Sequence, residues 1–178
     1  MNALLEDARE SDTGPLTLET VDVAALTAEC IRLLQPAVGP LSLRLDIADD
    51  FPARLRFDAD GWRTIVQNLV SNALKYTAEG EVVVCQSYDG RNVVMTVTDT
   101  GYGISDDDVE RIFDRFYVST NAPTNGQPRS GLGLAMVASA IAGMGGRIDV
   151  VSALGKGSTF TVIVPALALD ALVQEESA

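Results

Sequence analysis

Three polar side chains in the segment WRTIVQNLVSNALKYT have types and a spacing that suit chemistry. Asn68, Asn72 and Lys75 fall in one narrow sector of a helical wheel, and Tyr76 lies at the border of the apolar sector. Amide oxygens are hard ligands that suit Mg²⁺, and lysine is a point cation for phosphate. The stripe therefore predicts a site for a metal ion and phosphate oxygens, with an ordinary solvated helix face as the alternative.

A carboxylate followed by glycines is the second candidate. Asp99 ends the alternating run VVMTVTD, and Gly101, Gly103 and Ile104 follow it. Glycine lets the backbone approach a ligand closely, and the carboxylate can accept a hydrogen bond from an amino group such as adenine N6. A tight turn with an acidic cap is the alternative. The spacing does not fit the D-x-[DN]-x-[DN]-G pattern of a calcium loop.

The run SGLGLAMV is the third candidate, because Gly131 and Gly133 open a predicted helix. A helix amino terminus presents N–H groups and the positive end of the helix dipole to phosphate. The run follows residues 117–130, which have no periodicity and predict a functional lid or disorder. The chain has neither the Walker pattern GxxxxGK[ST] nor a Rossmann glycine run after its first strand, which disfavours those nucleotide-binding folds.

Length, charge and composition exclude several classes of protein. The 178 residues suffice for one domain with a sizeable core, and 47% of them are apolar. A net charge of −12 argues against a nucleic-acid binder. The chain contains no histidine, which excludes Ser-His-Asp and Cys-His catalysis, histidine metal sites and a histidine phosphoacceptor within this chain.

Cysteine usage and hydropathy bear on the compartment. Cys30 and Cys85 form no metal-binding spacing, and we interpret them as reduced core thiols of an intracellular protein. No apolar run approaches the roughly 20 residues of a membrane span, and the acidic start MNALLEDARES does not fit a signal peptide. We expect a cytoplasmic segment without direct membrane contact, and the sequence leaves open whether its parent protein is membrane-associated.

Periodicity predicts an α/β two-layer sandwich with a mixed sheet, because helices and hairpins are interleaved. Asp89–Gly90 is a strong hairpin signal between the strands predicted at 81–88 and 92–99. A capping box at Ser105 and Asp108 begins a short helix. The predicted helices cover residues 2–9, 22–35, 59–77, 105–113 and 132–144, and the predicted strands cover 41–47, 81–88, 92–99, 147–152 and 159–165. The tail from residue 166 is interpreted as a weak helix or linker.

The order and spacing of these motifs resemble the catalytic ATP-binding domain of sensor histidine kinases, in the superfamily with gyrase-type ATPases and Hsp90. The runs NLVSNALKYT, DTGYGI, IFDRFY and SGLGLAMV resemble the N, G1, F and G2 boxes of that family. The resemblance covers about residues 16–165, residues 1–15 are similar to the end of a dimerisation helix and its linker, and 166–178 form a tail. It implies the Bergerat fold, a largely antiparallel mixed sheet on about three helices.

The resemblance also implies roles for individual residues. Asn72 would hold Mg²⁺, Asn68 and Lys75 would contact the phosphates of ATP, and Tyr76 would pack on the adenine. The resemblance therefore implies three catalytic residues, which are Asn68, Asn72 and Lys75.

Further implied roles concern the base and the lid. Asp99 would read the adenine amino group, Phe113 and Phe116 would hinge the lid, and Thr159 would lie near the adenine through water or be an ordinary strand residue. The remaining nucleotide-binding positions are Gly101, Gly103, Ile104, Gly131, Leu132 and Gly133.

Three positions depart from the family pattern. Arg129 stands where many members carry glycine, which leaves the lid conformation open, and Met144 replaces a common histidine. Asn68 stands where gyrase-type ATPases carry the glutamate that activates water, which favours phosphoryl transfer to a protein over hydrolysis.

The resemblance implies a protein-histidine kinase domain that transfers the γ-phosphoryl group to a histidine on a separate dimerisation domain, with a response regulator as the next partner. A stand-alone serine kinase of the anti-sigma-factor type and an ATP-binding regulatory module without transfer activity are the alternatives. The missing N-box glutamate, the F box and the long lid favour the first of these three functions.

Overall fold

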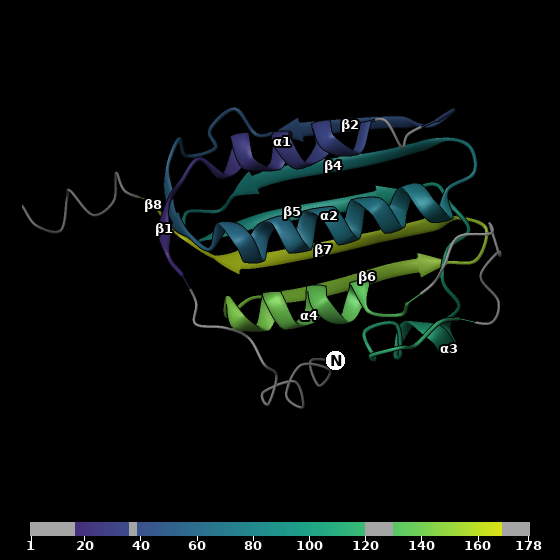
Figure 1. Cartoon of the computed structure of the whole chain (residues 1–178). Coiled ribbons are helices and arrows are strands. Elements are labelled where there is room, and N and C mark those ends of the chain that lie inside the picture. The colour runs from purple at the N-terminus through teal and green to yellow at the C-terminus, as the bar shows by residue number, and fades with distance from the viewer. Residues whose placement is uncertain (1–16, 36–38, 120–129, 169–178) are drawn as a thin grey trace, which may run out of the picture.

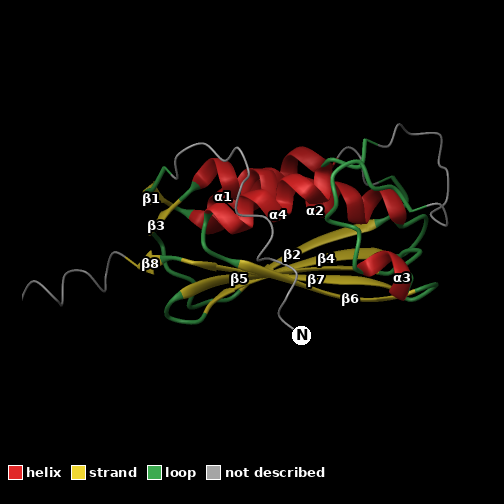
Figure 2. Ribbon diagram, turned by 90° about the horizontal axis from the view of Figure 1, so that it is seen from below, coloured by secondary structure: helices red, strands yellow, loops and turns green. Residues whose placement is uncertain are grey.

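One five-stranded sheet, covered by helices on one face, forms the body of the molecule in a computed structural model (Figures 1 and 2). The structure describes residues 17–35, 39–119 and 130–168. The sheet has the order β2-β4-β5-β7-β6, in which only β2 and β4 are parallel. Its strands are β2 (Ser42–Ile47), β4 (Glu81–Tyr88), β5 (Asn92–Asp99), β6 (Arg147–Ala153) and β7 (Gly157–Pro165). The predicted two-layer fold with a mixed, largely antiparallel sheet is confirmed.

Three helices form the second layer: α1 (Val23–Leu34), α2 (Ala59–Tyr76) and α4 (Gly133–Gly143). They lie side by side over the sheet, and the short helix α3 (Asp106–Val109) lies beyond its end (Figures 1 and 2). Helices α2 and α4 run in opposite directions, so that the end of α2 and the start of α4 lie toward α3, at right in Figure 1. The candidate residues of both helices are thereby brought to one end of the molecule.

Alternation along the strands decides which side chains face the helices. The inward positions of β5 are Val93, Met95 and Val97, and all three are fully buried. The wheel prediction for α2 is confirmed as well, because Trp62 and Ile65 belong to the same core. The main predicted helix and the central hairpin therefore pack as their sequence patterns require.

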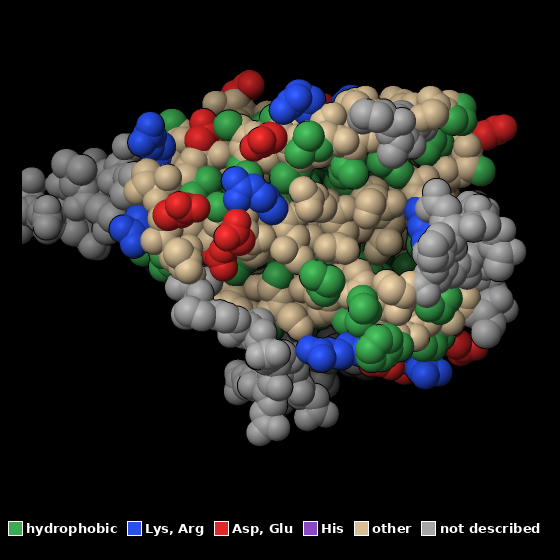
Figure 3. Space-filling model, viewed as in Figure 1, with side chains coloured by type: hydrophobic (Ala, Val, Ile, Leu, Met, Phe, Trp, Pro, Cys, Tyr) green, Lys and Arg blue, Asp and Glu red, His purple; other side chains and the backbone are tan. Residues whose placement is uncertain are grey.

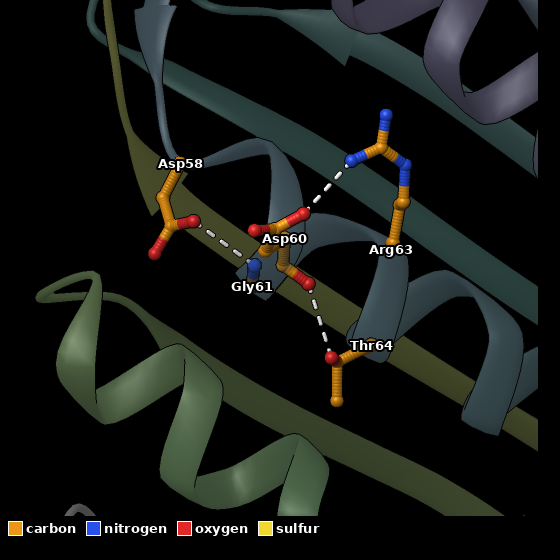
Figure 4. A network of polar contacts seen from close by, with 5 residues as sticks. All are labelled: Asp58, Asp60, Gly61, Arg63 and Thr64. Carbon is orange, nitrogen blue, oxygen red and sulfur yellow. Dashed lines mark hydrogen bonds and ion pairs between the residues drawn. The ribbon is translucent and has the colours of Figure 1, made fainter. Parts of the chain in front are cut away.

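A network of local bonds fixes the start of α2 (Figure 4). The Asp58 carboxylate caps the helix by accepting from Gly61 N at 3.0 Å, and Arg63 pairs with Asp60 at 2.9 Å. The Thr64 hydroxyl donates to Asp60 O at 3.0 Å. Capping with Asp and an acidic first turn both stabilise a helix amino terminus, so the start of α2 is set before its polar stripe begins.

The structure also contains a second, smaller sheet that the sequence analysis missed. Strands β1 (Glu19–Val21), β3 (Leu55–Phe57) and β8 (Leu167–Ala168) pair in the order β1-β3-β8, at the end away from α3 (Figure 1). Strands this short carry too little alternation to be recognised in a sequence. The start of the tail is therefore a strand, and the prediction of a weak helix or linker is wrong for residues 167–168.

Two further predictions need correction. The helix predicted over 105–113 ends at Val109, because Arg111 N and Asp114 N bond three residues back and continue the chain as turns. Cys30 is buried as predicted, but Cys85 is exposed, since its position on β4 faces away from the helices.

Some predictions fall on parts of the chain that are not described. The predicted helix at 2–9, Arg129 and residues 169–178 lie outside the described residues. In the part of the chain that the structure describes, no helix is long and apolar enough to cross a membrane.

Gln86 is a polar side chain on the face of β4 that packs toward the helices. It is 2% exposed, and among the described residues neither Nε2 nor Oε1 of its amide has a hydrogen-bond partner. A buried amide without partners forfeits the bonds that it makes to water in the unfolded chain.

Replacing this amide by an apolar chain of similar length should stabilise the fold. We expect Gln86→Met to raise the free energy of unfolding in urea by about 1–3 kcal/mol, because the desolvation penalty disappears. Ser87→Ala, an exposed change on the same strand, should stay within about 0.5 kcal/mol of the wild type. A less stable Gln86→Met protein would show that the amide is satisfied in solution.

Candidate nucleotide-binding site

A cavity of about 250 Å³ opens where α2 ends, α4 begins and β5 gives way to the loop before α3. The helix face of the molecule is visibly hollowed toward this end (Figure 3). The cavity wall includes the following predicted site residues: Asn68, Asn72, Lys75, Tyr76, Asp99, Gly103, Ile104, Gly131 and Gly133. Motifs that lie far apart in the sequence are thus brought to one cavity.

The polar stripe of α2 faces this cavity. Asn68, Asn72, Lys75 and Tyr76 are half-buried, and the Lys75 ammonium lies 5.7 Å from the centre of the Tyr76 ring. The Asn68 amide donates from Nδ2 to Thr64 O at 2.8 Å. This bond holds the Asn68 side chain along the helix and leaves its Oδ1 beside the start of α4.

Close approach between α2 and α4 depends on a missing side chain. A Cβ atom added at Gly133 would lie 2.9 Å from Asn68 Oδ1 and 3.8 Å from Asn72 Nδ2. Any other residue at this position would therefore displace either the Asn68 amide or the start of α4. The glycine lets the helix terminus and the two amides line one small volume.

The amino terminus of α4 has no side-chain cap, which distinguishes it from the other helices in the described ranges. Helices α1, α2 and α3 are capped by Asp22, Asp58 and Ser105. At α4 the N-cap position is Leu132, and its side chain makes no capping bond. The first N–H groups of this helix are therefore available as donors for an anion.

Asp99 is a buried acid of the site, at 6% exposure. Its Oδ1 accepts from Gly101 N at 2.9 Å and from Ser158 N at 3.3 Å. Burial raises the pKa of the Asp99 carboxyl above its ordinary value, against the lowering effect of the bonds from Gly101 and Ser158. Since both backbone donors use Oδ1, the second oxygen of the carboxylate can accept from a ligand donor.

The loop after Asp99 is clamped to the end of α2. Tyr102 N donates to Tyr76 O at 3.0 Å, and a Cβ added at Gly101 would lie 2.4 Å from the same carbonyl oxygen. Gly101 does not line the cavity; it permits the contact that holds Asp99 against α2. Its role as a nucleotide-binding residue stays a prediction beside this packing role.

A second carboxylate, Asp108, ties the end of α3 to the segment that follows it. It accepts from the hydroxyl groups of Tyr117, of Ser119 at 2.7 Å and of Ser105 at 2.8 Å. These three bonds, the Tyr117 bond foremost, hold the pKa of the Asp108 carboxyl below its ordinary value. Asp108, Tyr117 and Ser119 all line the cavity, so this cluster forms a further part of its wall.

The two phenylalanines of the IFDRFY run lie in different surroundings. Phe113 is half-buried and packs against the core, whereas Phe116 is 72% exposed and has a φ of 64°. Phe116 N donates to Gly131 O at 2.9 Å, which joins the two ends of the predicted lid. Neither Phe116 nor Leu132 lines the cavity. Both flank the predicted lid, of which residues 120–129 lie outside the described part.

Thr159 is not brought to the cavity. Its hydroxyl oxygen lies 3.1 Å from that of Thr98, and its position alternates with the buried Ser158 and Phe160, so its side chain faces away from the helices. The neighbouring Ser158 lines the cavity in its place, because the register pairs Ser158 with Asp99. Ser158 could have been found from the sequence, because it lies two positions before the inward Phe160 and side chains two apart on a strand share a face.

Other residues of the cavity wall had no predicted site role, although several lie within the motifs. These further lining residues are Ala73, Tyr102, Asp108, Ile112, Tyr117, Val118, Ser119, Ser130, Leu134, Leu154, Ser158 and Phe160. Most come from turns and loops, whose path is set by tertiary contacts and not by periodicity.

Comparison with known families agrees with this geometry. Residues 57–168 match the family described as histidine kinase-, DNA gyrase B- and HSP90-like ATPase. The chain belongs to this family. It carries the family's ATP-binding domain, of the type found in sensor histidine kinases, so the resemblance of its motifs is confirmed.

Individual histidine kinases are similar to this chain in sequence or in structure. The sensor-like histidine kinase SenX3 of Mycobacterium tuberculosis is 38% identical over 150 residues, which cover 83% of this chain and 36% of SenX3. Full-length ShkA, solved in complex with AMPPNP, matches with a TM-score of 0.77 at 30% identity, over 93% of this chain and 34% of ShkA. The mycobacterial sensor histidine kinase MprB matches at 0.74 and 25% identity, over 85% of this chain and 100% of that structure. The chain thus spans about a third of the length of SenX3.

The opposite pKa shifts of the two cavity carboxylates predict opposite effects on the stability of this domain without ligand. Because the folded-state pKa of Asp99 is raised, its ionised form opposes folding, and this penalty appears as the pH rises above about 4. Asp99→Asn keeps the Oδ1 acceptor, so we expect it to be at least as stable as the wild type at neutral pH.

Asp108→Asn should behave in the opposite way. The lowered folded-state pKa gives stability that is present above about pH 4 and is lost as the pH falls through the folded value. Thermal unfolding of both variants and the wild type across pH measures these differences. If Asp99→Asn were less stable than the wild type at neutral pH and equally stable in acid, burial would not destabilise the ionised form of Asp99 as proposed.

Proposed function

We propose that this domain binds ATP with Mg²⁺ and transfers its γ-phosphoryl group to a histidine on a separate dimerisation domain. The observation that carries the proposal is the uncapped start of α4, which lies against Asn68 and Asn72 in the cavity that Asp99 also lines. Family membership and the similarity to SenX3 and ShkA support the same function.

The cavity offers one region for each part of a nucleotide. The second oxygen of Asp99 suits the exocyclic amino group of adenine, and the Tyr76 ring is an aromatic surface on the same cavity wall. Lys75 and the N–H groups at the start of α4 suit the phosphates. The base therefore lies toward β5, and the triphosphate lies between α2 and α4.

The donor set fits a magnesium ion that is held mainly by the nucleotide. Within the described ranges there is no group of three acidic, cysteine or histidine residues that could hold a metal ion alone. Asn72 supplies a neutral amide oxygen on the cavity wall, and Asn68 supplies a second amide beside it. When bound, Mg²⁺ supplies positive charge that offsets the charge of the phosphates.

The residues of this chain position the phosphoryl donor, and the acceptor comes from elsewhere. The chain contains no histidine, so a phosphorylated histidine must belong to another segment or another polypeptide. The side chain of Asn68 is an amide, which cannot remove a proton from water as a carboxylate does. Phosphoryl transfer relies chiefly on positioning and charge neutralisation, and the residues of α2 and α4 supply both. A response regulator is the proposed next acceptor.

Binding of nucleotide tests the site directly. We expect Asn72→Ala and Asp99→Asn each to weaken ADP binding, measured by calorimetry with Mg²⁺, about tenfold or more, because each removes a bond to a charged or polar ligand group. Gln67→Ala is the matched control, since Gln67 is exposed on α2 and does not line the cavity. Wild-type affinity in both site variants would refute the site assignment.

Transfer of labelled phosphate tests the reaction. We expect acid-labile label on a histidine-bearing dimerisation domain of the parent kinase when ATP and this domain are supplied. The same dimerisation domain with its phosphoacceptor histidine replaced by alanine should remain unlabelled. Acid-stable label on serine would support the serine-kinase alternative, and nucleotide binding without any label would support a regulatory module.

A further inference from the structure

One wall of the cavity is built around a buried carboxylate that three hydroxyl groups share. Asp108 is 8% exposed, and its Oδ1 accepts from the Tyr117 hydroxyl. Its Oδ2 accepts from the hydroxyl groups of Ser105 at 2.8 Å and of Ser119 at 2.7 Å. Asp108, Tyr117 and Ser119 all line the cavity, and no part of the nucleotide has yet been placed at their wall.

This wall connects the base region of the cavity to its phosphate region. Ser105 directly follows Ile104, which lines the cavity on the segment that leads away from Asp99. At the other end, a Cβ added at Gly131 would lie 2.7 Å from Tyr117 O, so Tyr117 lies against the turn that opens α4. The ribose joins the base of a nucleotide to its phosphates, and it is therefore the part expected beside this wall.

The bond to Asp108 decides what the Tyr117 hydroxyl can offer to a ligand. Its three donors hold the pKa of the Asp108 carboxyl below the ordinary value, so the carboxylate is ionised at neutral pH and takes the phenol proton. The Tyr117 oxygen can then only accept from a further group. An acceptor beside a carboxylate suits a sugar hydroxyl, which donates, and repels a phosphate. The Arg111 guanidinium, 4.3 Å from the centre of the Tyr117 ring, restrains the ring as well.

We propose that Tyr117 recognises the ribose of the nucleotide by accepting a hydrogen bond from a sugar hydroxyl, and that Asp108 is the positioning residue that orients it. The inference rests on the proposed binding of ATP. Without the carboxylate of Asp108, the Tyr117 hydroxyl loses the acceptor that directs its proton. A site that bonds to a hydroxyl of its ligand discriminates against an analogue without that hydroxyl. The consequence is a preference for a ribonucleotide over a deoxyribonucleotide.

The affinities of the wild type for ADP, 2′-deoxy-ADP and 3′-deoxy-ADP, measured by calorimetry with Mg²⁺, test this recognition without any substitution. We expect one of the two deoxynucleotides to bind about fivefold more weakly than ADP, which is the size of one neutral hydrogen bond. Equal affinities for all three, with normal binding of ADP, overturn this inference and leave the proposed function standing. A wild type that does not bind ADP overturns both.

Substitution shows whether Tyr117 makes the discrimination. Tyr117→Phe keeps the ring beside Arg111, and it should bind ADP as weakly as the wild type binds the disfavoured deoxynucleotide. Binding of that deoxynucleotide should change less than about twofold, since the bond is already missing. Tyr88→Phe is the matched control, because it removes a tyrosine hydroxyl on β4 that does not line the cavity. A folded Tyr117→Phe protein that keeps the wild-type ratio of affinities overturns the inference.

The same ratio tests the role of Asp108. Asp108→Ala should lose the discrimination, and Asp108→Ala/Tyr117→Phe should lose no more than either single variant, because both act through one bond. Asp108→Asn keeps an oxygen that can accept from the Tyr117 hydroxyl, so it should keep the wild-type ratio. Thermal unfolding checks that each variant is folded at the temperature of the measurement. Discrimination that is kept in Asp108→Ala and lost in Tyr117→Phe would overturn the positioning role.

Discussion

The site depends on two glycines that let neighbouring segments come close to the polar face and to the end of α2. Gly133 brings the uncapped start of α4 against Asn68, and Gly101 brings the loop after Asp99 against Tyr76 O. Both contacts depend on how α2 lies across the sheet, which its apolar face and its capped start determine. The donors for phosphate and the acceptor for a base amino group are therefore placed by the packing of one helix.

The positive groups that suit a phosphate lie at the cavity, although the chain as a whole is negatively charged. The chain carries a net charge of −12, which repels a polyphosphate at long range. Lys75 and the start of α4 offset this repulsion at one wall of the cavity. Asp99 and Asp108 lie on other walls of the same cavity. The burial of Asp99 and the three hydroxyl donors of Asp108 give these acids opposite pKa shifts, so one is suited to binding a ligand donor and the other to holding the wall together.

Much of this arrangement could be predicted from the sequence, because it depends on periodicity and on contiguous motifs. The polar stripe of α2, the β4–β5 hairpin and the start of α4 are local patterns, and the structure has them close to the predicted positions. Ser158 and the wall-forming role of Asp108 were missed because they depend on strand register and on loop contacts between distant residues. For Thr159 the sequence left open a place near the adenine or an ordinary strand position, and in the structure its side chain lies on the face of β7 opposite to that of Ser158. The small sheet was missed because its strands are too short to show alternation.

The central claim is that one nucleotide bridges the start of α4 and the loop after Asp99. Backbone amide signals recorded by NMR during titration with ADP and Mg²⁺ test it most directly. We expect the largest shifts at Gly133, Leu134 and Gly101, with little change at Leu55–Phe57 in the small sheet at the other end of the molecule. Shifts confined to the small sheet, or none at saturating ADP, would contradict it.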